Sequence, residues 1–242
     1  MVLKFSIIFF IVFPKLASAS FDIVFETGAL WQQRNDVRIP NTGGTRLNFD
    51  EFDSGPFFHY RAELFWHVND THNLRAVYAP LNLVVNGQVP YAVNYDNVNF
   101  NANQDIEIDY TFNSYRLTYY YSFWGNGDNQ LNLGITGKVR DAKIQLQQGS
   151  TKASYDNVGF VPLIYFEYQK TLGTEWLFHF NMDAAAASQG RAFDVSAKLR
   201  HRILTDSLLG IGLRSLEGGA DNDEVYTFSW VNYLTIDFLK SF

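Results

Sequence analysis

The stretch VYTFSWVNYLTIDFLKSF, from Val225 to Phe242, alternates between two chemically different faces. Counted back from the last residue by twos, one face is mostly apolar and aromatic and holds Phe242, Lys240, Phe238, Ile236, Leu234, Asn232, Trp230, Phe228 and Tyr226. The other face mixes polar and apolar side chains. A period of two indicates a β-strand whose two sides meet different environments. The stretch therefore predicts a strand that finishes the chain on an aromatic residue.

The other end of the chain has the features of a secretory signal peptide. Lys4 precedes an apolar run over residues 5–13, and Ala17-Ser18-Ala19 fits a cleavage site of small residues before Ser20. The apolar run is too short to cross a bilayer as a helix. We expect residues 1–19 to be removed and residues 20–242 to form one domain.

Composition narrows the class of the protein. The chain has no cysteine, which excludes a disulfide scaffold and any metal or nucleophile site built on cysteine. The formal net charge is −6 and becomes more negative when Lys4 and Lys15 leave with the signal, which argues against nucleic acid as a partner. No stretch after residue 19 approaches the roughly 20 apolar residues of a membrane helix. Without disulfides or membrane helices, residues 20–242 must be stabilised either by a large hydrophobic core or by strands that cross a membrane.

Alternation and turn signals divide the mature chain into ten segments, each long enough for the roughly 9 to 11 residues of a tilted membrane strand. The segments are 21–33, 57–68, 73–85, 106–123, 130–146, 158–171, 175–187, 192–203, 207–217 and 225–242. Connections after even-numbered segments are uniformly short, whereas those after odd-numbered segments, such as 34–56, 86–105, 147–157 and 218–224, are generally longer. Short turns at one end and longer loops at the other are typical of outer-membrane barrels.

The number of strands depends on how residues 89–100 are interpreted. Residues 89–100 also alternate, and they follow the hairpin signal Asn86-Gly87. We interpret them as a hairpin arm above the membrane, with eight or twelve strands as the alternatives to ten. The five tryptophans then form two belts, with Trp66, Trp124 and Trp176 near the short turns and Trp31 and Trp230 near the opposite ends.

The signal peptide, the alternating strands and the terminal Phe242 together resemble the broad family of small Gram-negative outer-membrane β-barrel proteins. The resemblance implies an all-β fold, a transmembrane antiparallel up-and-down barrel in the bacterial outer membrane with both mature termini in the periplasm. It also implies that Phe242 is an assembly signal for the barrel-assembly machinery, and that outer-membrane lipid and lipopolysaccharide are partners. It names no activity, and no cofactor is expected.

The face opposite the apolar one carries charge on nearly every segment. We predict a charge network in the lumen formed by Glu26, Arg61, Glu63, Arg75, Arg116, Lys138, Arg140, Glu167, Asp183, Asp194, Lys198, Arg214 and Asp237. A ten-stranded barrel is little wider than the eight-stranded size whose interior side chains just fill. Because buried charges must be paired, the sequence favours a plugged lumen. A narrow selective channel is the alternative, with Arg61, Arg116, Lys138 and Arg140 setting its selectivity.

Two histidines offer candidate catalytic groups. His59 precedes Glu63 by four residues and follows Ser54, while His179 precedes Asp183 by four residues. A serine, a histidine and an acid at the outer rim would suit an acyl hydrolase or transferase acting on lipid A. No known motif of such an enzyme matches, so a lumen histidine satisfied by a carboxylate is the favoured interpretation.

Two other features have a structural and a functional interpretation. Pro80 and Pro162 fall inside predicted strands, where a missing N–H marks either a bulge or a lateral opening for a lipid or apolar ligand. The acidic turn with Asp221, Asp223 and Glu224 offers oxygen ligands for a metal ion, but it lacks the spacing of a calcium loop.

Outer-membrane proteases of the omptin type are also ten-stranded barrels that use acids with a histidine at the extracellular mouth. Here the acids are present in loops 50–53 and 221–224, but no histidine lies in those loops and the omptin motifs are missing. We therefore expect a non-enzymatic outer-membrane barrel with a plugged, charge-paired lumen and a structural, surface-contact or slow solute-passage role. A lipid gateway and a narrow channel are the alternatives.

Overall fold

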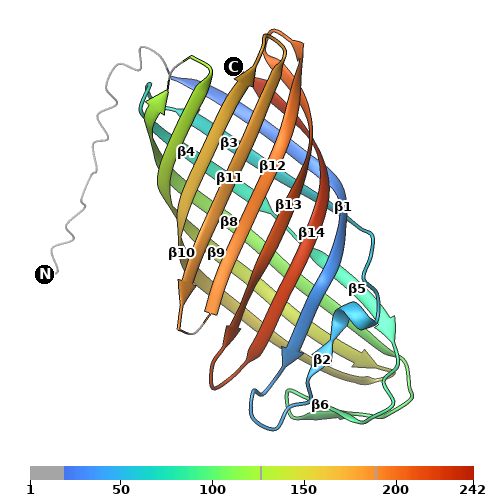
Figure 1. The fold of residues 1–242 in the computed structure, drawn as a ribbon. Helices are drawn as coiled ribbons and strands as arrows, with labels where there is room; N and C mark the ends of the chain where they lie inside the picture. The colour runs from blue at the N-terminus through green and yellow to red at the C-terminus, as the bar shows by residue number, and fades with distance from the viewer. Residues whose placement is uncertain (1–18, 126, 189) are drawn as a thin grey trace, which may run out of the picture.

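A computed structural model describes residues 19–125, 127–188 and 190–242, and these form a closed antiparallel barrel of ten strands, as predicted (Figure 1). The predicted signal peptide lies, except for Ala19, outside the described residues and stays a prediction. The wall consists of β1 (Ser20–Arg38), β3 (Phe57–His67), β4 (His72–Ala79) with β5 (Asn82–Gly87), β8 (Ile106–Gly125), β9 (Asn129–Gln148), β10 (Thr151–Leu172), β11 (Trp176–Ala187), β12 (Gly190–Leu204), β13 (Ser207–Asp221) and β14 (Tyr226–Ser241). Here β4 and β5 together make the third wall strand, because both pair with β8.

The first and last strands close the barrel. The β1–β14 ladder runs from the pair Asp22 and Ser241 to the pair Arg38 and Tyr226. Beyond it, the Phe242 N–H donates to the Phe21 carbonyl at 2.8 Å. The C-terminal strand β14 therefore covers the edge of β1 and closes the barrel.

The two ends of the barrel differ as the loop pattern predicted, with three corrections. Short turns join β3 to β4, β8 to β9, β10 to β11 and β12 to β13, at the end where the chain finishes (Figure 1). The predicted loop 147–157 is wrong, because residues 151–157 continue β10 and pair with β9 up to a tight turn at Gly149, whose φ is +56°. Residues 34–38, predicted as loop, likewise belong to β1, and residues 218–221 belong to β13. Among the described residues, only the β1–β3 and β5–β8 connections form long loops.

These two loops contain short elements of their own. The β1–β3 loop holds β2 (Leu47–Asn48), which pairs with β1, and the 3₁₀ helix η1 (Phe49–Glu51). The β5–β8 loop holds a separate hairpin of β6 (Val93–Tyr95) and β7 (Val98–Phe100), which confirms the predicted hairpin arm. Its tight turn is Asp96-Asn97, both at positive φ, rather than the predicted Asn86-Gly87.

A β-bulge changes the parity of β1 near its outer end. The pairing with β14 shifts by one residue between Gln32 and Arg34, so that Arg34 lies opposite Trp230. Before the bulge the even-numbered residues of β1 face inward, whereas after it Asn35 and Val37 are the fully buried residues. A one-residue insertion moves every later side chain to the other face. Arg34 and Arg38 are therefore directed outward.

The outward face between the two ends is an apolar band. Phe25, Leu117, Ile135, Ile164 and Leu213 are each at least 59% exposed. Such exposure around a whole barrel matches the lipid-facing surface of a membrane barrel. No helix among residues 19–125, 127–188 and 190–242 is long and apolar enough to cross a bilayer.

Candidate functional site

The inside of the barrel is filled by three layers of side chains. On β1 the inward order is Val24, then Glu26, then Leu30, and on β14 it is Leu239, Asp237 and Tyr233. The strands β3 and β8 show the same order of apolar, charged and apolar positions. The apolar groups belong to two separate clusters, one at each end of the barrel. The charged layer between them is the feature that the sequence singled out for the lumen.

The charged layer is one continuous ion-pair network of six cations and five carboxylates. Its members are Arg61, Arg75, Arg116, Lys198, Arg200, Arg214, Glu26, Glu63, Asp183, Asp194 and Asp237. Every one of these residues is buried. They come from β1, β3, β4, β8, β11, β12, β13 and β14, so the network joins eight of the ten wall strands.

Six members close a ring across the lumen. Asp194 accepts from Arg61 (3.4 Å) and Arg116 (2.5 Å). Asp183 accepts from Arg116 (2.7 Å) and Arg75 (3.2 Å). Glu63 closes the ring through Arg75 (2.7 Å) and Arg61 (3.3 Å). Alternation of guanidinium and carboxylate around a ring satisfies each buried charge from two sides.

The rest of the network extends from this ring toward the end with the short turns. Arg214 binds Asp194 (2.6 Å) and lies 3.5 Å from Glu26. Lys198 contacts Glu26 (2.5 Å) and Asp237 (3.2 Å), and Arg200 binds Asp237 (2.5 Å). Sequence reasoning did not include Arg200 in the network. Arg200 lies on β12 with the same parity as Asp194 and Lys198, so the alternation that predicted those two residues to face inward also predicts Arg200 to face inward.

Three predicted network residues lie apart from it. Lys138 is buried with its Nζ 4.8 Å from the centroid of the Phe112 ring, and no carboxylate pairs with it among the described residues. Arg140 is half-buried and donates to Asn157. Glu167 is buried against His179, whose Nε2 lies 2.6 Å away. Parity along a strand does not determine which partner each of these three side chains meets.

The predicted histidine–acid pairs are not brought together. His59 packs edge-on against Tyr233, with ring centroids 4.8 Å apart, while both partners of Glu63 are arginines. His179 binds Glu167, and Asp183 binds arginines. The reason is strand geometry, because residues four apart share a face yet lie about 13 Å apart. Ser54 lies in the β1–β3 loop, where its backbone carbonyl accepts a hydrogen bond from the Gln32 N–H at 2.9 Å.

The acidic turn is held by hydrogen bonds of its own. Asp221 accepts from the Asn41 side chain at 2.9 Å, and the Asn222 side chain accepts the backbone N–H of Glu224 and Val225. Within the described ranges, no group of three or more His, Asp or Glu side chains is arranged to hold a metal ion. Asp221, Asp223 and Glu224 therefore form a hydrogen-bonded turn.

An apolar cap fills the mouth at the end with the long loops. We give this name to the buried loop residues Ile39, Leu47, Phe49, Val89, Val93, Tyr95 and Phe100, which pack with inward residues of the wall. The Tyr95 hydroxyl donates to the Ile144 carbonyl at 2.9 Å, and burial raises the pKa of this phenol. The two loops are joined by the Thr45 N–H, which donates to the Asn94 carbonyl at 2.8 Å. The cap and the ion-pair network are two successive barriers inside one barrel.

The wall is interrupted at Pro80, between β4 and β5. The β3–β4 ladder ends at the pair Ala62 and Tyr78, and β5 pairs with β8 alone, so residues 57–61 of β3 lack a strand partner on this side in the described chain. A cavity of about 10 Å³ lies at this seam. Its lining combines Tyr60 and Pro80 of the wall with His59, Arg116 and Arg214 of the lumen. The cavity is large enough for about one water molecule.

Pro162 marks a second place where strand pairing ends. The β10–β11 ladder begins at the pair Ile164 and Ala184, so Pro162 lies on the part of β10 that pairs only with β9. A proline at an unpaired edge loses no ladder hydrogen bond. Neither proline coincides with a register shift, since those occur near Gln33, Phe123 and Ile203. The bulge interpretation is thus replaced by interrupted pairing at both positions.

Comparisons with known proteins relate this chain to outer-membrane barrels by fold. No family model matches the sequence, and no curated protein matches it. The outer membrane protease OmpT from Escherichia coli is similar over 92% of this chain and 97% of its own, with a TM-score of 0.59 and 8% identity. The transport unit of the autotransporter AIDA-I from Escherichia coli reaches a TM-score of 0.44 at 7% identity, over 94% and 91% of the two chains. Ail of Yersinia pestis reaches 0.41 at 9% identity, over 92% and 99%.

The first of these likenesses establishes the fold alone. At 8% identity it carries no information on activity, because one fold serves many functions. The chain thus has the fold of an outer-membrane β-barrel protein, and its function has to be argued from its own residues.

We predict that Asp194→Asn lowers the free energy of unfolding by about 3 to 5 kcal/mol, because three buried guanidiniums lose a shared carboxylate. Urea unfolding in lipid vesicles measures this change. Asp206→Asn, which removes the exposed carboxylate that pairs with Lys240, is the matched control and should leave the unfolding curve in place. Equal curves for wild type and Asp194→Asn would show that the network does not stabilise the barrel.

Proposed function

We propose that this protein is a sealed, non-enzymatic outer-membrane barrel that acts through its outer surface and does not conduct solutes. The observation that supports this proposal is the closed ring of Arg61, Glu63, Arg75, Asp183, Arg116 and Asp194 across the lumen. A conducting pore needs a continuous water-filled path. Here both the ion-pair network and the apolar cap stand in that path.

The proposal includes the location and orientation of the barrel. The outward apolar band supports insertion in the bacterial outer membrane, after export by the signal peptide. The short turns and the C-terminal strand then face the periplasm, where barrel-assembly machinery would read the strand that ends at Phe242. The long loops with the apolar cap face outward and present the surface for contact with other molecules.

Planar-bilayer recording tests the sealed lumen. The wild-type protein is expected to produce no discrete conductance steps, while an open porin inserted in the same way serves as the positive control. Replacing residues 91–101 with a short Gly-Ser linker removes the β6–β7 hairpin from the cap, and this variant should also stay silent because the ion-pair network still crosses the lumen. Reproducible steps from the wild-type protein would contradict the proposal.

The seam at Pro80 favours a second candidate function, the entry of a lipid or apolar ligand through the wall. Segment 49–56 crosses the outer end of this seam. Its Phe52 packs on Gly87 of β5, and its Asp53 and Ser54 carbonyls accept hydrogen bonds from Gln32 of β1. Below the seam, Tyr60, Tyr78 and Tyr115 form a row of ring contacts on the outward face. Displacement of one segment would therefore widen the seam without unfolding the barrel.

A disulfide clamp tests this gateway, since the natural chain has no cysteine. Tyr60 and Pro80 line the same cavity, so Tyr60→Cys/Pro80→Cys places two thiols across the seam. If the seam admits apolar ligands, oxidation should weaken binding of a fluorescent long-chain fatty acid on the order of tenfold, and reduction should restore it. The two single-cysteine variants are the controls. Equal binding by the oxidised and reduced clamp would exclude entry at this seam.

A further inference from the structure

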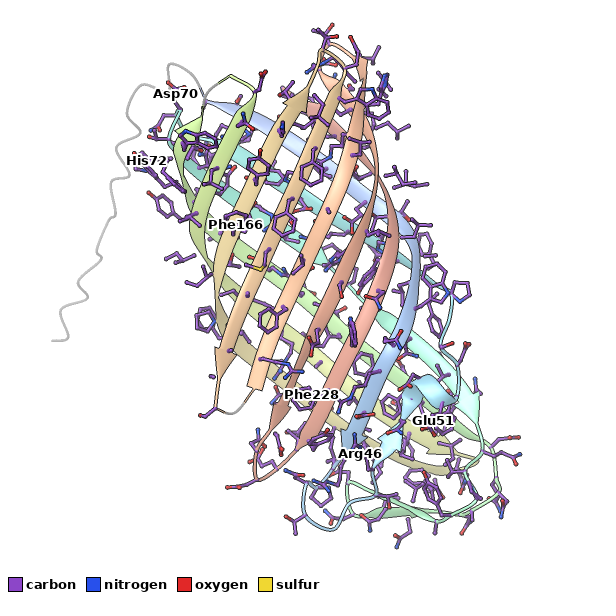
Figure 2. The ribbon with its side chains drawn as sticks, in the orientation of Figure 1. Arg46, Glu51, Asp70, His72, Phe166 and Phe228 are labelled. Carbon is purple, nitrogen blue, oxygen red and sulfur yellow. The ribbon has the colours of Figure 1, made fainter. Side chains whose placement is uncertain are left out.

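A groove of about 330 Å³ lies on the outer wall, above the apolar band at the end with the long loops. We call it the Phe228 groove. Its walls include Arg34 of β1, Arg191 of β12, Glu217 of β13, and Phe228 and Trp230 of β14. Trp230 is exposed and also belongs to the outward apolar band, so this side of the groove is continuous with the lipid-facing surface. In Figure 2, Phe228 and Arg46 lie toward this end of the barrel, and Asp70 and His72 lie at the other.

The bulge in β1 creates one wall of this groove. If the ladder continued regularly through Gln33, with no bulge, Arg34 would follow the earlier parity and face the lumen. With it, Arg34, Asp36 and Arg38 lie opposite Trp230, Phe228 and Tyr226 on the outward face. An irregularity of the ladder therefore places two arginines directly above the apolar band.

The aromatic rings of the groove are held between guanidinium groups. The Arg34 and Arg191 guanidiniums lie 5.2 and 5.4 Å from the centroid of the Phe228 ring. Gly219 lies behind this ring, because a Cβ there would come within 2.6 Å of a Phe228 ring carbon. Above it, Arg38 and Arg46 lie 5.5 and 5.0 Å from the Tyr226 ring. Cation–π contacts of this kind fix arginines that remain accessible to solvent.

The exposed charges around the groove are mixed. Four arginines lie over the two rings, Asp36 and Glu217 pair with three of them, and the acidic turn with Asp221, Asp223 and Glu224 joins β13 to β14. Arg34 donates from Nε to Asp36 at 2.6 Å and from Nη2 to the Tyr226 hydroxyl at 2.8 Å, and Arg191 donates from Nε and Nη2 to Glu217. A guanidinium has five N–H donors, so both arginines keep donors for a ligand. Their side chains are 39% and 46% exposed.

We propose that the Phe228 groove binds a phosphate group of a phosphorylated outer-leaflet glycolipid of the lipopolysaccharide type, whose acyl chains lie on the apolar band below. Paired arginines recognise phosphate through charge-assisted, often bidentate hydrogen bonds. The position above Trp31 and Trp230 matches the depth at which headgroup phosphates meet an aromatic belt. This inference rests on the proposed membrane location, and it is independent of the sealed lumen.

Native mass spectrometry of the full-length barrel in detergent, with bis-phosphorylated lipid A added, tests the site. Arg34→Gln/Arg191→Gln should bind lipid A on the order of tenfold more weakly than wild type, because two phosphate donors are lost. Arg202→Gln is the matched control, since this exposed arginine lies near the β12–β13 turn at the opposite end and donates to the Thr205 carbonyl. It should bind lipid A as the wild type does.

Two measurements on the wild-type protein decide the question even if the double variant fails to fold. Dephosphorylated lipid A should bind on the order of tenfold more weakly than the phosphorylated form, and inorganic phosphate at equal concentration should not displace lipid A. Equal binding of both lipid forms would overturn the proposal. So would full displacement by inorganic phosphate, which would indicate a site for free anions. Neither result would alter the conductance of the barrel, so failure of the lipid site is distinguishable from failure of the sealed-lumen proposal.

Discussion

The buried ion-pair network is the interaction on which the rest of this structure depends. Six cations and five carboxylates are removed from water, and any one of them left alone would cost several kcal/mol. Each charge is therefore acceptable only when strands distant in sequence bring its partners to the same depth. Asp194 illustrates this requirement, because its three guanidinium partners come from β3, β8 and β13. A shift of any of these strands by one residue would turn its charged side chain toward the outside.

The network lies midway along the barrel, and the space beyond it is filled in another way. Toward the long loops, the wall strands carry inward apolar residues, and the apolar cap covers them with side chains from the two loops. The wall changes at the same depth. Pairing ends at Pro80 and near Pro162, and β1 has its bulge at Gln33. Both interruptions of strand pairing thus lie in the half of the barrel above the network, as do the seam and the Phe228 groove.

Much of the wall was predictable because a period of two is a local property of the sequence. The ten strands, the inward parity of Arg61, Glu63 and Arg116, and the short turns follow from alternation and turn residues alone. The strand register and the partners do not. Four-residue spacing suggested that His59 acts with Glu63, yet the two are separated along one strand while Arg75 of the neighbouring strand reaches Glu63. Likewise, no sequence signal announces the bulge that turns Arg34 outward.

The long loops also make contacts that alternation along the sequence does not predict. Residues 89–100 were interpreted as a hairpin arm standing above the membrane, and their alternation did identify a hairpin. Alternation could not indicate that Val93 and Tyr95 are fully buried in the mouth of the barrel, because their partners come from β9 and from another loop. The contacts that close the lumen are long-range, and they arise only once the wall is complete.

The most direct test of this account is the accessibility of the lumen to a small water-soluble thiol reagent, which the absence of native cysteine makes clean. Ser114→Cys and Ser196→Cys place a thiol of nearly the same size at positions that are 2% and 3% exposed inside the barrel, and Ser54→Cys places one in an exposed loop. If the lumen is sealed, the thiol at position 54 is labelled rapidly and those at positions 114 and 196 are not labelled in the folded protein, from either side of the membrane. Labelling of either lumen thiol at a rate comparable with that of the loop would contradict a sealed barrel.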